Sequence, residues 1–452
     1  MRKVRKYFVQ KLHKYIGVSI LVIIIVIVAA NFIKKDGTMS EKENRMLEQR
    51  PEVTMTDITD GKFMQKYESY VSDQFIFRDF WVSVKARIDL LLGKNYSNGI
   101  YKGKSGYLLE EAKAPDEENM AKNIAAVNAL ADGGKVNVYT MIVPNSVYIM
   151  DNKLPAFAPV RDQSLDLQNF SEQLSENVKQ IDVTSALMEQ RTKEQLYYRN
   201  DHHWTTFGAY TAFLEAAKTL GLDPGKVSYD RYTVSNNFAG TMAATSGYGA
   251  SKKDSIEIFV PNNSDIEYFV EYVEQMEKKS SVYDSSKLET SDKYAVFFGG
   301  NYPMIRIKTT NRDGKNLLVI KDSYANCFVP FLIPYYKEIT MIDPRYYYDD
   351  VNKEISDSEI TDVLFLYNAN TFFEDNSLSS IFESYEDAAE TDAGAGGGTQ
   401  TAGETASEQD KESETDSKSG ESSTEESGGA AAADETGAET NTDTDTNTDG
   451  GN

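Results

Sequence analysis

Residues 317–326 read LLVIKDSYAN and have the form of a strand that passes through a polar turn into a helix. Its first four residues form a short apolar run of the kind found in buried strands of parallel sheets. The polar turn Lys321-Asp322-Ser323 follows at once, and a helix is expected to begin at about Tyr324. A strand, a turn and a helix in this order place Ser323 at the carboxyl edge of a sheet, where α/β proteins carry their reactive side chains.

Similar apolar runs lie on both sides of this stretch, at residues 136–143, 181–183, 339–342 and 363–367. Helical patterns separate them, and the strongest covers residues 204–220, which Gly221 and Pro224 close. This alternation predicts an α/β fold with a mostly parallel sheet and helices on both faces. Residues 228–292 break the alternation with many Gly, Ser and Asn residues and short aromatic strands, and are expected to form a β-rich insertion or lid.

The N-terminal part contains an uncharged run, IGVSILVIIIVIVAANFI, at residues 16–33. As a helix it is about 27 Å long, close to the hydrocarbon thickness of a bilayer. Six basic residues precede it and two, Lys34 and Lys35, follow it, which predicts a cytoplasmic segment 1–15 and an extracellular remainder. A cleaved signal peptide is the alternative. The run exceeds the usual apolar length of about 7–15 residues and no small-x-small site follows it, which favours a single-pass anchor in the cell membrane.

Three further segments follow the anchor. Residues 34–95 place apolar side chains at three- and four-residue steps, which predicts amphipathic helices forming a stalk or cap. Residues 96–386 hold the strand and helix alternation of the main domain, and residues 228–292 are its insertion. Residues 387–452 lack aromatic and large aliphatic side chains, so they cannot bury enough apolar surface to fold and are expected to be disordered.

Charge and cysteine content exclude some classes of protein. The formal net charge is −24, but residues 386–452 hold 19 acidic and two basic side chains, which leaves only −7 for the rest. A nucleic-acid binder would show a basic face, so none is expected here. The single cysteine, Cys327, permits no intramolecular disulfide, and an exported protein without disulfides fits a bacterial surface.

Histidine is scarce, and this limits the kinds of catalytic site that the chain can form. The chain has three histidines, and His13 lies before the anchor, so imidazole chemistry outside must use His202 or His203. Asp201 and His203 are two residues apart and share one side of an extended segment. The carboxylate is then expected to orient the imidazole as a general base that faces Ser323 as the nucleophile. The helix after Ser323 would offer backbone N–H groups to a developing oxyanion.

Each of these features has a simpler explanation. Asp201 suits a helix N-cap, and an Asp-Ser pair between a strand and a helix is common capping chemistry. Cys327 is an alternative nucleophile, although a lone cysteine is more often a small core residue. Asp-His-His also suits a binuclear metal site, but such a centre needs further His and Asp ligands, so no metal is expected.

The run Asp201-His202-His203-Trp204-Thr205 resembles the signature of the DHHW family of bacterial exported proteins, and the Asp-x-His-Trp-Thr motif of the alginate O-acetylation proteins. These are acetyltransferases that resemble SGNH hydrolases and use a Ser-His-Asp triad. Other stretches that fit the same family are SEKENR at 40–45, FGGNYP at 298–303, KDSY at 321–324 and DPRYY at 343–347. The resemblance covers about residues 40–386 and implies an SGNH-like three-layer fold.

The resemblance also implies roles for single residues. It makes Ser323 the nucleophile, His203 the general base and Asp201 the residue that orients it, while His202 fills a variable position. Tyr324 and Arg345 match family residues near the site, where they would hold carboxylates or hydroxyls of a polymer; a structural pair of Arg345 with Asp343 is the alternative. The same group of candidates for oxyanion or substrate binding includes Asn368, Asn370 and Trp204.

The order Asp, His, Ser is reversed relative to ordinary SGNH hydrolases, and the alginate acetylation proteins share this reversal. The resemblance therefore implies acetyl transfer to a cell-surface or exported polysaccharide, with no cofactor and with a membrane-bound O-acyltransferase as the donor partner. Two other functions stay open: an esterase that removes acetyl groups with the same triad, and a non-catalytic protein that binds or assembles glycans.

Overall fold

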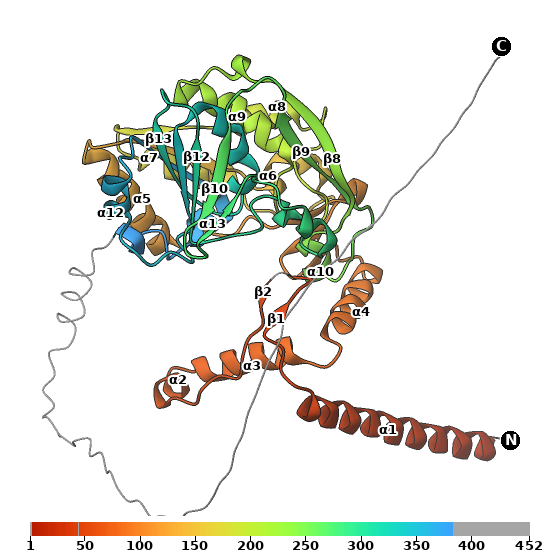
Figure 1. Cartoon of the computed structure of the whole chain (residues 1–452). Helices are drawn as coiled ribbons and strands as arrows, with labels where there is room; N and C mark the ends of the chain where they lie inside the picture. Colours follow the sequence, from red (N-terminus) through yellow and green to blue (C-terminus); the bar gives the residue numbers. More distant parts are fainter. Residues whose placement is uncertain (1, 44, 383–452) are drawn as a thin grey trace, which may run out of the picture. The chain divides into compact units, whose positions relative to one another are not determined.

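The structure is a computed structural model that describes residues 2–43 and 45–382, with side chains from residue 11 onward (Figure 1). The segment 387–452, predicted from the sequence to be disordered, lies outside the described residues.

The main domain is built on one eight-stranded sheet with the strand order β11-β10-β12-β14-β13-β15-β6-β7. Five neighbouring strands are parallel, and three antiparallel strands extend one edge. The parallel strands are β6 (Asn137–Val143), β7 (Val178–Gln180), β13 (Asn316–Lys321), β14 (Glu338–Ile342) and β15 (Asp362–Asn368). The antiparallel strands are β10 (Tyr268–Tyr272), β11 (Glu277–Lys279) and β12 (Met304–Thr309). The predicted α/β fold with a mostly parallel sheet is confirmed.

Alternation along β13 explains the three layers, because successive side chains of a strand point to opposite faces. Leu317 and Val319 pack into one apolar core, and Leu318 and Ile320 into another. The first core is covered by α6 (Ser146–Ile149), α8 (Thr184–Gln190), α9 (Thr206–Leu220) and α11 (Ala325–Phe328). The second is covered by α5 (Glu117–Asp132), α7 (Gln163–Glu172), α12 (Val351–Asp357) and α13 (Ala369–Glu374). Figure 1 shows α5 and α12 on one side of the sheet and α8 and α9 on the other.

Residues 228–292 are β-rich, but they do not form one unit. The strands β8 (Tyr229–Phe238) and β9 (Asp254–Pro261) pair as a separate antiparallel ribbon, while β10 and β11 belong to the edge of the main sheet. The short helix α10 (Thr241–Thr245) lies in the connection between the two ribbon strands.

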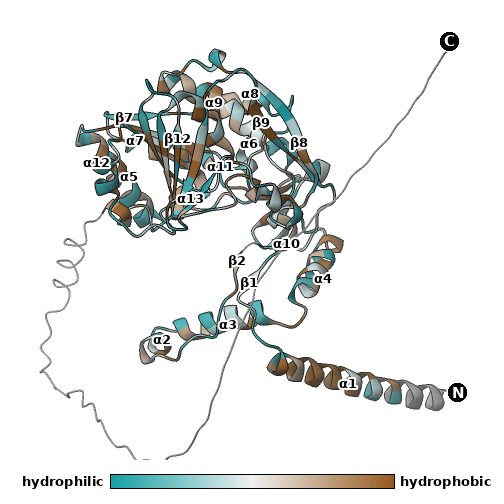
Figure 2. Ribbon diagram, in the orientation of Figure 1, coloured by the Kyte–Doolittle hydropathy of each residue, from teal (hydrophilic) through white to brown (hydrophobic). Residues whose placement is uncertain are grey.

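The N-terminal part begins with α1 (Arg2–Ile33), whose residues Lys11–Ile33 are long and apolar enough to cross a membrane (Figure 2). A short hairpin of β1 (Met39–Ser40) and β2 (Arg45–Met46) follows. The helices α2 (Met55–Thr59), α3 (Lys62–Gln74) and α4 (Arg78–Leu91) come next. A small antiparallel sheet of β3 (Tyr96–Ser97), β4 (Ile100–Lys102) and β5 (Leu108–Glu110) leads into the main domain. Single 3₁₀ turns lie at Lys104–Gly106, Asp151–Lys153, Pro224–Lys226, Ser285–Glu289, Lys293–Val296, Val329–Phe331, Ile333–Tyr335 and Ser380–Phe382.

Two local expectations are corrected. The strand expected at residues 181–183 runs three residues earlier, as β7, and only the Ile181 N–H continues the pairing, by donating to the Thr140 carbonyl at 2.8 Å. The helix expected after Ser323 is a single α-helical turn, α11, because Pro330 and Pro334 turn the following residues into 3₁₀ segments.

Candidate active site

Ser323 stands two residues beyond the end of β13, an interior strand of the sheet that lies between β14 and β15. The turn that carries it is fixed by the buried Asp322. One carboxylate oxygen of Asp322 accepts from the Tyr324 N–H at 2.8 Å, and the other accepts from the Asn368 N–H at 2.9 Å. The second bond ties the turn to the end of β15, so the Ser323 backbone has a defined position.

The Asp-His-His segment is a tight loop directly before α9. Thr205 caps this helix, because its hydroxyl accepts from the Gly208 N–H at 3.1 Å. Gly208 is required at that position, since a Cβ there would lie 2.3 Å from the Leu196 carbonyl oxygen. Helix capping and close packing together fix the direction in which the loop presents His203.

Asp201, His203 and Ser323 are connected by two hydrogen bonds. The distances are 2.5 Å from Asp201 Oδ1 to His203 Nδ1 and 2.7 Å from His203 Nε2 to Ser323 Oγ. With Asp201 ionised, Nδ1 carries the ring proton and donates it to the carboxylate. Nε2 is then left to accept from the Ser323 hydroxyl. This tautomer is the one that a general base next to a serine nucleophile requires.

The second oxygen of Asp201 is held by Thr241, the first residue of α10. The Thr241 N–H donates to Asp201 Oδ2 at 3.1 Å, and the Thr241 hydroxyl donates to it at 3.3 Å. Gly240 makes this approach possible, because a Cβ at that position would lie 2.4 Å from the same oxygen. The carboxylate therefore has partners on both oxygens and its plane is fixed.

Tyr294 holds the imidazole from its flat side. Its ring stacks on that of His203 with centroids 3.7 Å apart and planes 13° from parallel. Its hydroxyl donates to the Ser323 carbonyl oxygen at 3.0 Å. Burial raises the pKa of Tyr294 well above its ordinary value, so the hydroxyl keeps its proton. One side chain thus touches both the base and the backbone of the serine.

Burial governs the charge states of the pair. Burial alone would raise the pKa of Asp201, but the neighbouring His203 and His202 and the hydrogen bonds from His203 hold it well below its usual range. Burial and the charge of His202 lower the pKa of His203 to about 4, against the opposing pull of Asp201. At neutral pH the carboxylate is ionised and the imidazole is neutral.

The pH dependence of activity follows from these charge states. Below its pKa His203 carries a second proton and cannot accept one from Ser323, so kcat/KM is expected to fall only below about pH 4–5 rather than near the ordinary imidazole value of about 6.5. A pH profile with an ester substrate measures this limb. In His202→Gln, which removes a group that lowers this pKa, the limb should move to higher pH. A wild-type limb near pH 6.5 would contradict the assignment.

Trp204 and Tyr324 are fully buried, and this corrects their expected contact with substrate. The Trp204 indole N–H donates to the Tyr324 carbonyl oxygen at 3.0 Å, and the Tyr324 hydroxyl donates to the His202 carbonyl oxygen at 2.5 Å. The two side chains tie the histidine loop to the serine turn in both directions. They are positioning residues, because neither ring has surface to offer.

The side-chain amides of Asn368 and Asn370 donate to groups other than the Ser323 hydroxyl. Asn368 Nδ2 donates to Asp322 and to the Thr371 hydroxyl, and Asn370 Nδ2 donates to the Glu111 carbonyl. An oxyanion role for either stays a prediction without a supporting contact.

Arg345 forms a two-pronged ion pair with Asp343, at 2.8 and 2.6 Å, and is partly exposed. It follows β14, the strand next to β13, so it lies at the same edge of the sheet as Ser323. The structural pairing of Arg345 is present, and its contact with a polymer stays a prediction.

The alternative reactive groups have other surroundings. Cys327 is fully buried, and burial raises the pKa of its thiol to about 12, which keeps it protonated. Within the described residues, Asp201, His202 and His203 could offer three ligand atoms to a metal ion. His203 Nδ1 is hydrogen-bonded to Asp201 and His203 Nε2 to Ser323, an arrangement that suits proton transfer.

Gly240, Thr241 and Tyr294 were not found from the sequence. All three come from the irregular segments around the β-rich ribbon, where hydrophobic periodicity carries no information. A Gly-Thr pair at the start of a short helix has no distinctive pattern in the sequence, and one buried tyrosine among 28 tyrosines carries no signal of its own.

Comparison with known proteins was made for sequence and for structure. A family model described as DHHW protein matches residues 114–342, which is half of the chain. A crystal structure of a DHHW family protein from Eubacterium siraeum is similar, with a TM-score of 0.54 and 26% identity, over 63% of this chain and 95% of that one. Bacillus cereus PatB1, solved with a sulfonyl adduct, shares the fold at a TM-score of 0.51 and 22% identity, over 63% of this chain and 98% of PatB1.

Two curated relatives carry the description "Probable alginate O-acetylase AlgJ". The protein from Azotobacter vinelandii is 23% identical over 177 residues, or 36% of this chain and 45% of the relative. The protein from Pseudomonas syringae pv. tomato is 25% identical over 167 residues, or 35% of this chain and 42% of the relative. The match thus spans less than half the length of these relatives. The resemblance predicted from the sequence is confirmed.

Proposed function

Because this chain belongs to the DHHW family, we propose that it transfers acyl groups, most simply acetyl, to hydroxyls of a polysaccharide outside the cytoplasm. The observation that carries the proposal is the continuous path Asp201–His203–Ser323, with its two distances of 2.5 and 2.7 Å. Relatives described as probable alginate O-acetylases support acetyl as the group and a polysaccharide as its acceptor.

The first half of the proposed reaction loads the serine. His203 Nε2 takes the Ser323 hydroxyl proton while Oγ attacks the carbonyl carbon of an acyl donor. The tetrahedral intermediate collapses, the bond to the donor's leaving group breaks, and the leaving group takes the proton from His203. Ser323 is now an acyl ester and His203 is neutral again.

The negative oxygen of the intermediate needs hydrogen-bond donors. Within the described residues the Ser323 N–H donates to no other group, and it lies two residues before α11, beside the nucleophile. We assign it as one oxyanion donor.

The second half unloads the serine. A sugar hydroxyl gives its proton to His203 as its oxygen attacks the acyl carbon, and the collapse returns that proton to Ser323 Oγ. An acylated sugar and the free enzyme remain. Water would take the same path and give a free acid, so transferase and esterase differ only in the acceptor.

The location is part of the proposal. Basic residues before the anchor outnumber those after it, which favours an outward-facing domain. The acyl donor is then a membrane-bound O-acyltransferase that passes the acyl group across the bilayer, since cytoplasmic acetyl-CoA does not reach this side.

The test is acyl transfer by the full chain in detergent micelles, with an artificial acetyl ester as donor and alginate as acceptor. The expected result is acetyl ester on the polysaccharide, detected by mass spectrometry, and a matching decrease in free acetate. A neutral glucan of similar length serves as the matched acceptor. Free acetate that stays constant with every acceptor would show an esterase. Loss of activity with chelator and its return with Zn²⁺ or Mn²⁺ would overturn the triad and favour a metal site.

A further inference from the structure

Helix α4, Arg78–Leu91, has one face of large apolar side chains that the described residues leave uncovered. The members of this face are Phe77, Phe80, Trp81, Ile88, Leu91 and Leu92, with exposed fractions from 42% to 87%. At about 100° per residue the four members inside α4 fall within an arc of about 100°, and Phe77 and Leu92 flank the two ends of the helix. The charged side chains of the helix lie outside that arc. Figure 2 shows apolar and polar colours side by side on α4.

The opposite face of α4 is occupied by the protein. Ala86 is fully buried there, and the Val82 backbone lies against Gly247, where a Cβ would come within 2.7 Å of the Val82 carbonyl oxygen. Gly247 follows α10, the helix whose Thr241 holds Asp201. The helix therefore has one face against the main domain and one face without a partner among the described residues.

The start of α4 lies at the end of the membrane-spanning helix. Asn31 Oδ1, in the last turn of α1, accepts from the Ile76 N–H at 2.8 Å. Lys34 Nζ, one residue after α1, donates to the Gln74 carbonyl oxygen at 3.1 Å. The corner between α3 and α4 is therefore at the depth where α1 leaves the hydrocarbon and enters the headgroup layer.

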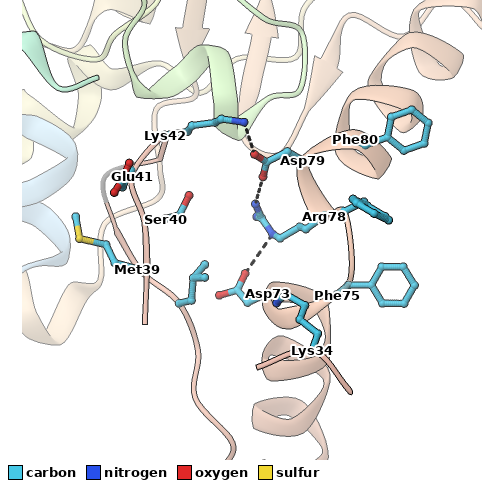
Figure 3. Close-up of a pocket in the computed structure, with 12 residues that line it drawn as sticks. Lys34, Met39, Ser40, Glu41, Lys42, Asp73, Phe75, Arg78, Asp79 and Phe80 are labelled. Carbon is cyan, nitrogen blue, oxygen red and sulfur yellow. Dashed lines mark hydrogen bonds and ion pairs between the residues drawn. The ribbon is translucent and has the colours of Figure 1, made fainter. Parts of the chain in front are cut away.

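Ion pairs join the start of α4 to the turn of the β1–β2 hairpin. Arg78 Nη1 lies 2.7 Å from Glu43 Oε1, and Lys42 Nζ lies 2.8 Å from Asp79 Oδ2. Figure 3 shows Lys42, Arg78 and Asp79 close together, while the rings of Phe75 and Phe80 point away from them. Arg78 and Asp79 at the start of the helix are paired with residues of the hairpin. The apolar side of the helix faces away from these pairs.

We propose that α4 lies in the boundary layer of the membrane and binds the lipid bilayer through this apolar face. Aromatic side chains are favoured at that depth, and an amphipathic helix gains stability when its apolar face enters the boundary between headgroups and acyl chains. The bilayer is the occupant because the anchor itself brings the first turn of α4 to its surface. Through Gly247 the lipid-bound helix then supports the segment that holds Asp201.

Tryptophan fluorescence tests this proposal directly, because the chain has two tryptophans and Trp204 is fully buried. The full chain is placed in phosphatidylcholine nanodiscs, one copy per disc, with and without bromine on the acyl chains. Bromine quenches only at contact, so wild-type emission is expected to fall by about half in brominated discs, since one of two tryptophans meets the lipid. Trp81→Phe, which keeps the apolar face, should lose almost nothing.

Two further variants test whether the apolar face itself causes the quenching. Ile88→Ser with Leu91→Ser weakens the apolar face and should reduce the quenching of Trp81, while the matched pair Lys85→Ser and Arg87→Ser on the polar sides should leave it unchanged. Circular dichroism checks that each variant is folded. Equal quenching of the wild type and Trp81→Phe would overturn the proposal. The proposal would also be overturned if the Trp81 emission shifted to shorter wavelength only when several copies share one disc. In that case a second copy of the chain, and not lipid, would cover the apolar face.

Discussion

Replacing Ser323 by alanine is expected to lower acyl turnover by a factor of about 10³–10⁶ while leaving the fold intact, as removal of a serine nucleophile does in other triad enzymes. The hydroxyl makes one described contact, with His203 Nε2 at 2.7 Å, so its loss leaves the turn bonds of Asp322 in place. The measurement is kcat/KM for an acetyl ester by stopped assay, with thermal unfolding as the check on folding.

Covalent labelling separates this role from a structural one. A sulfonyl fluoride should modify Ser323 in the wild type, and the modified peptide should be absent in Ser323→Ala. The matched control is Ser146→Ala, a buried serine at the start of α6 that makes no contact with the triad. If Ser323→Ala keeps wild-type turnover, Ser323 is not the nucleophile.

The second large effect is expected at Gly240, which no sequence motif marks. An added Cβ would lie 2.2 Å from the Asp201 Cβ and 2.4 Å from Asp201 Oδ2. The first of these atoms is fixed by the backbone and the second is held by hydrogen bonds. The carboxylate must therefore move, and His203 loses its orientation. Gly240→Ala is expected to reduce kcat by a factor of about 10²–10⁴, since a triad with a misplaced carboxylate or a wrong tautomer loses about that much.

A spectroscopic readout makes this test specific. In the wild type, ¹⁵N chemical shifts should show the His203 proton on Nδ1, and in Gly240→Ala this preference should weaken. Gly225→Ala is the control, because its Cβ would meet only the flexible end of the Asp223 side chain, at 3.2 Å. A Gly240→Ala protein with unchanged kcat and an unchanged ¹⁵N spectrum would show that Asp201 does not need this position.

Most of the fold could be predicted because its main strands are buried on both faces. A run such as Leu317-Leu318-Val319-Ile320 is apolar at every position, and that pattern fits a central parallel strand. The short edge strand β7 was misplaced by three residues, since two of its three side chains are exposed and polar and only the backbone pairing defines it.

The candidate site also has residues that could be predicted from the sequence and residues that could not. Asp201, His203 and Ser323 could be proposed because scarce residue types and a strand end mark them. Thr241 and Tyr294 could not, because they reach the triad through tertiary packing of segments 38 and 91 residues beyond His203. Trp204 shows a limit of motif reasoning: the resemblance selected the residue, and only its burial shows that it positions a loop.

The burial of Cys327 has an experimental consequence. The thiol is four residues after Ser323, has no exposed surface, and its sulfur lies 3.8 Å from the Tyr324 carbonyl oxygen to which Trp204 also donates. An alkylating reagent therefore reaches it only after a local opening of the structure around the serine turn. The rate of alkylation then measures the free energy of that opening, much as amide exchange does for a backbone N–H. The chain has a single cysteine, so it carries its own site-specific probe of opening at the candidate active site.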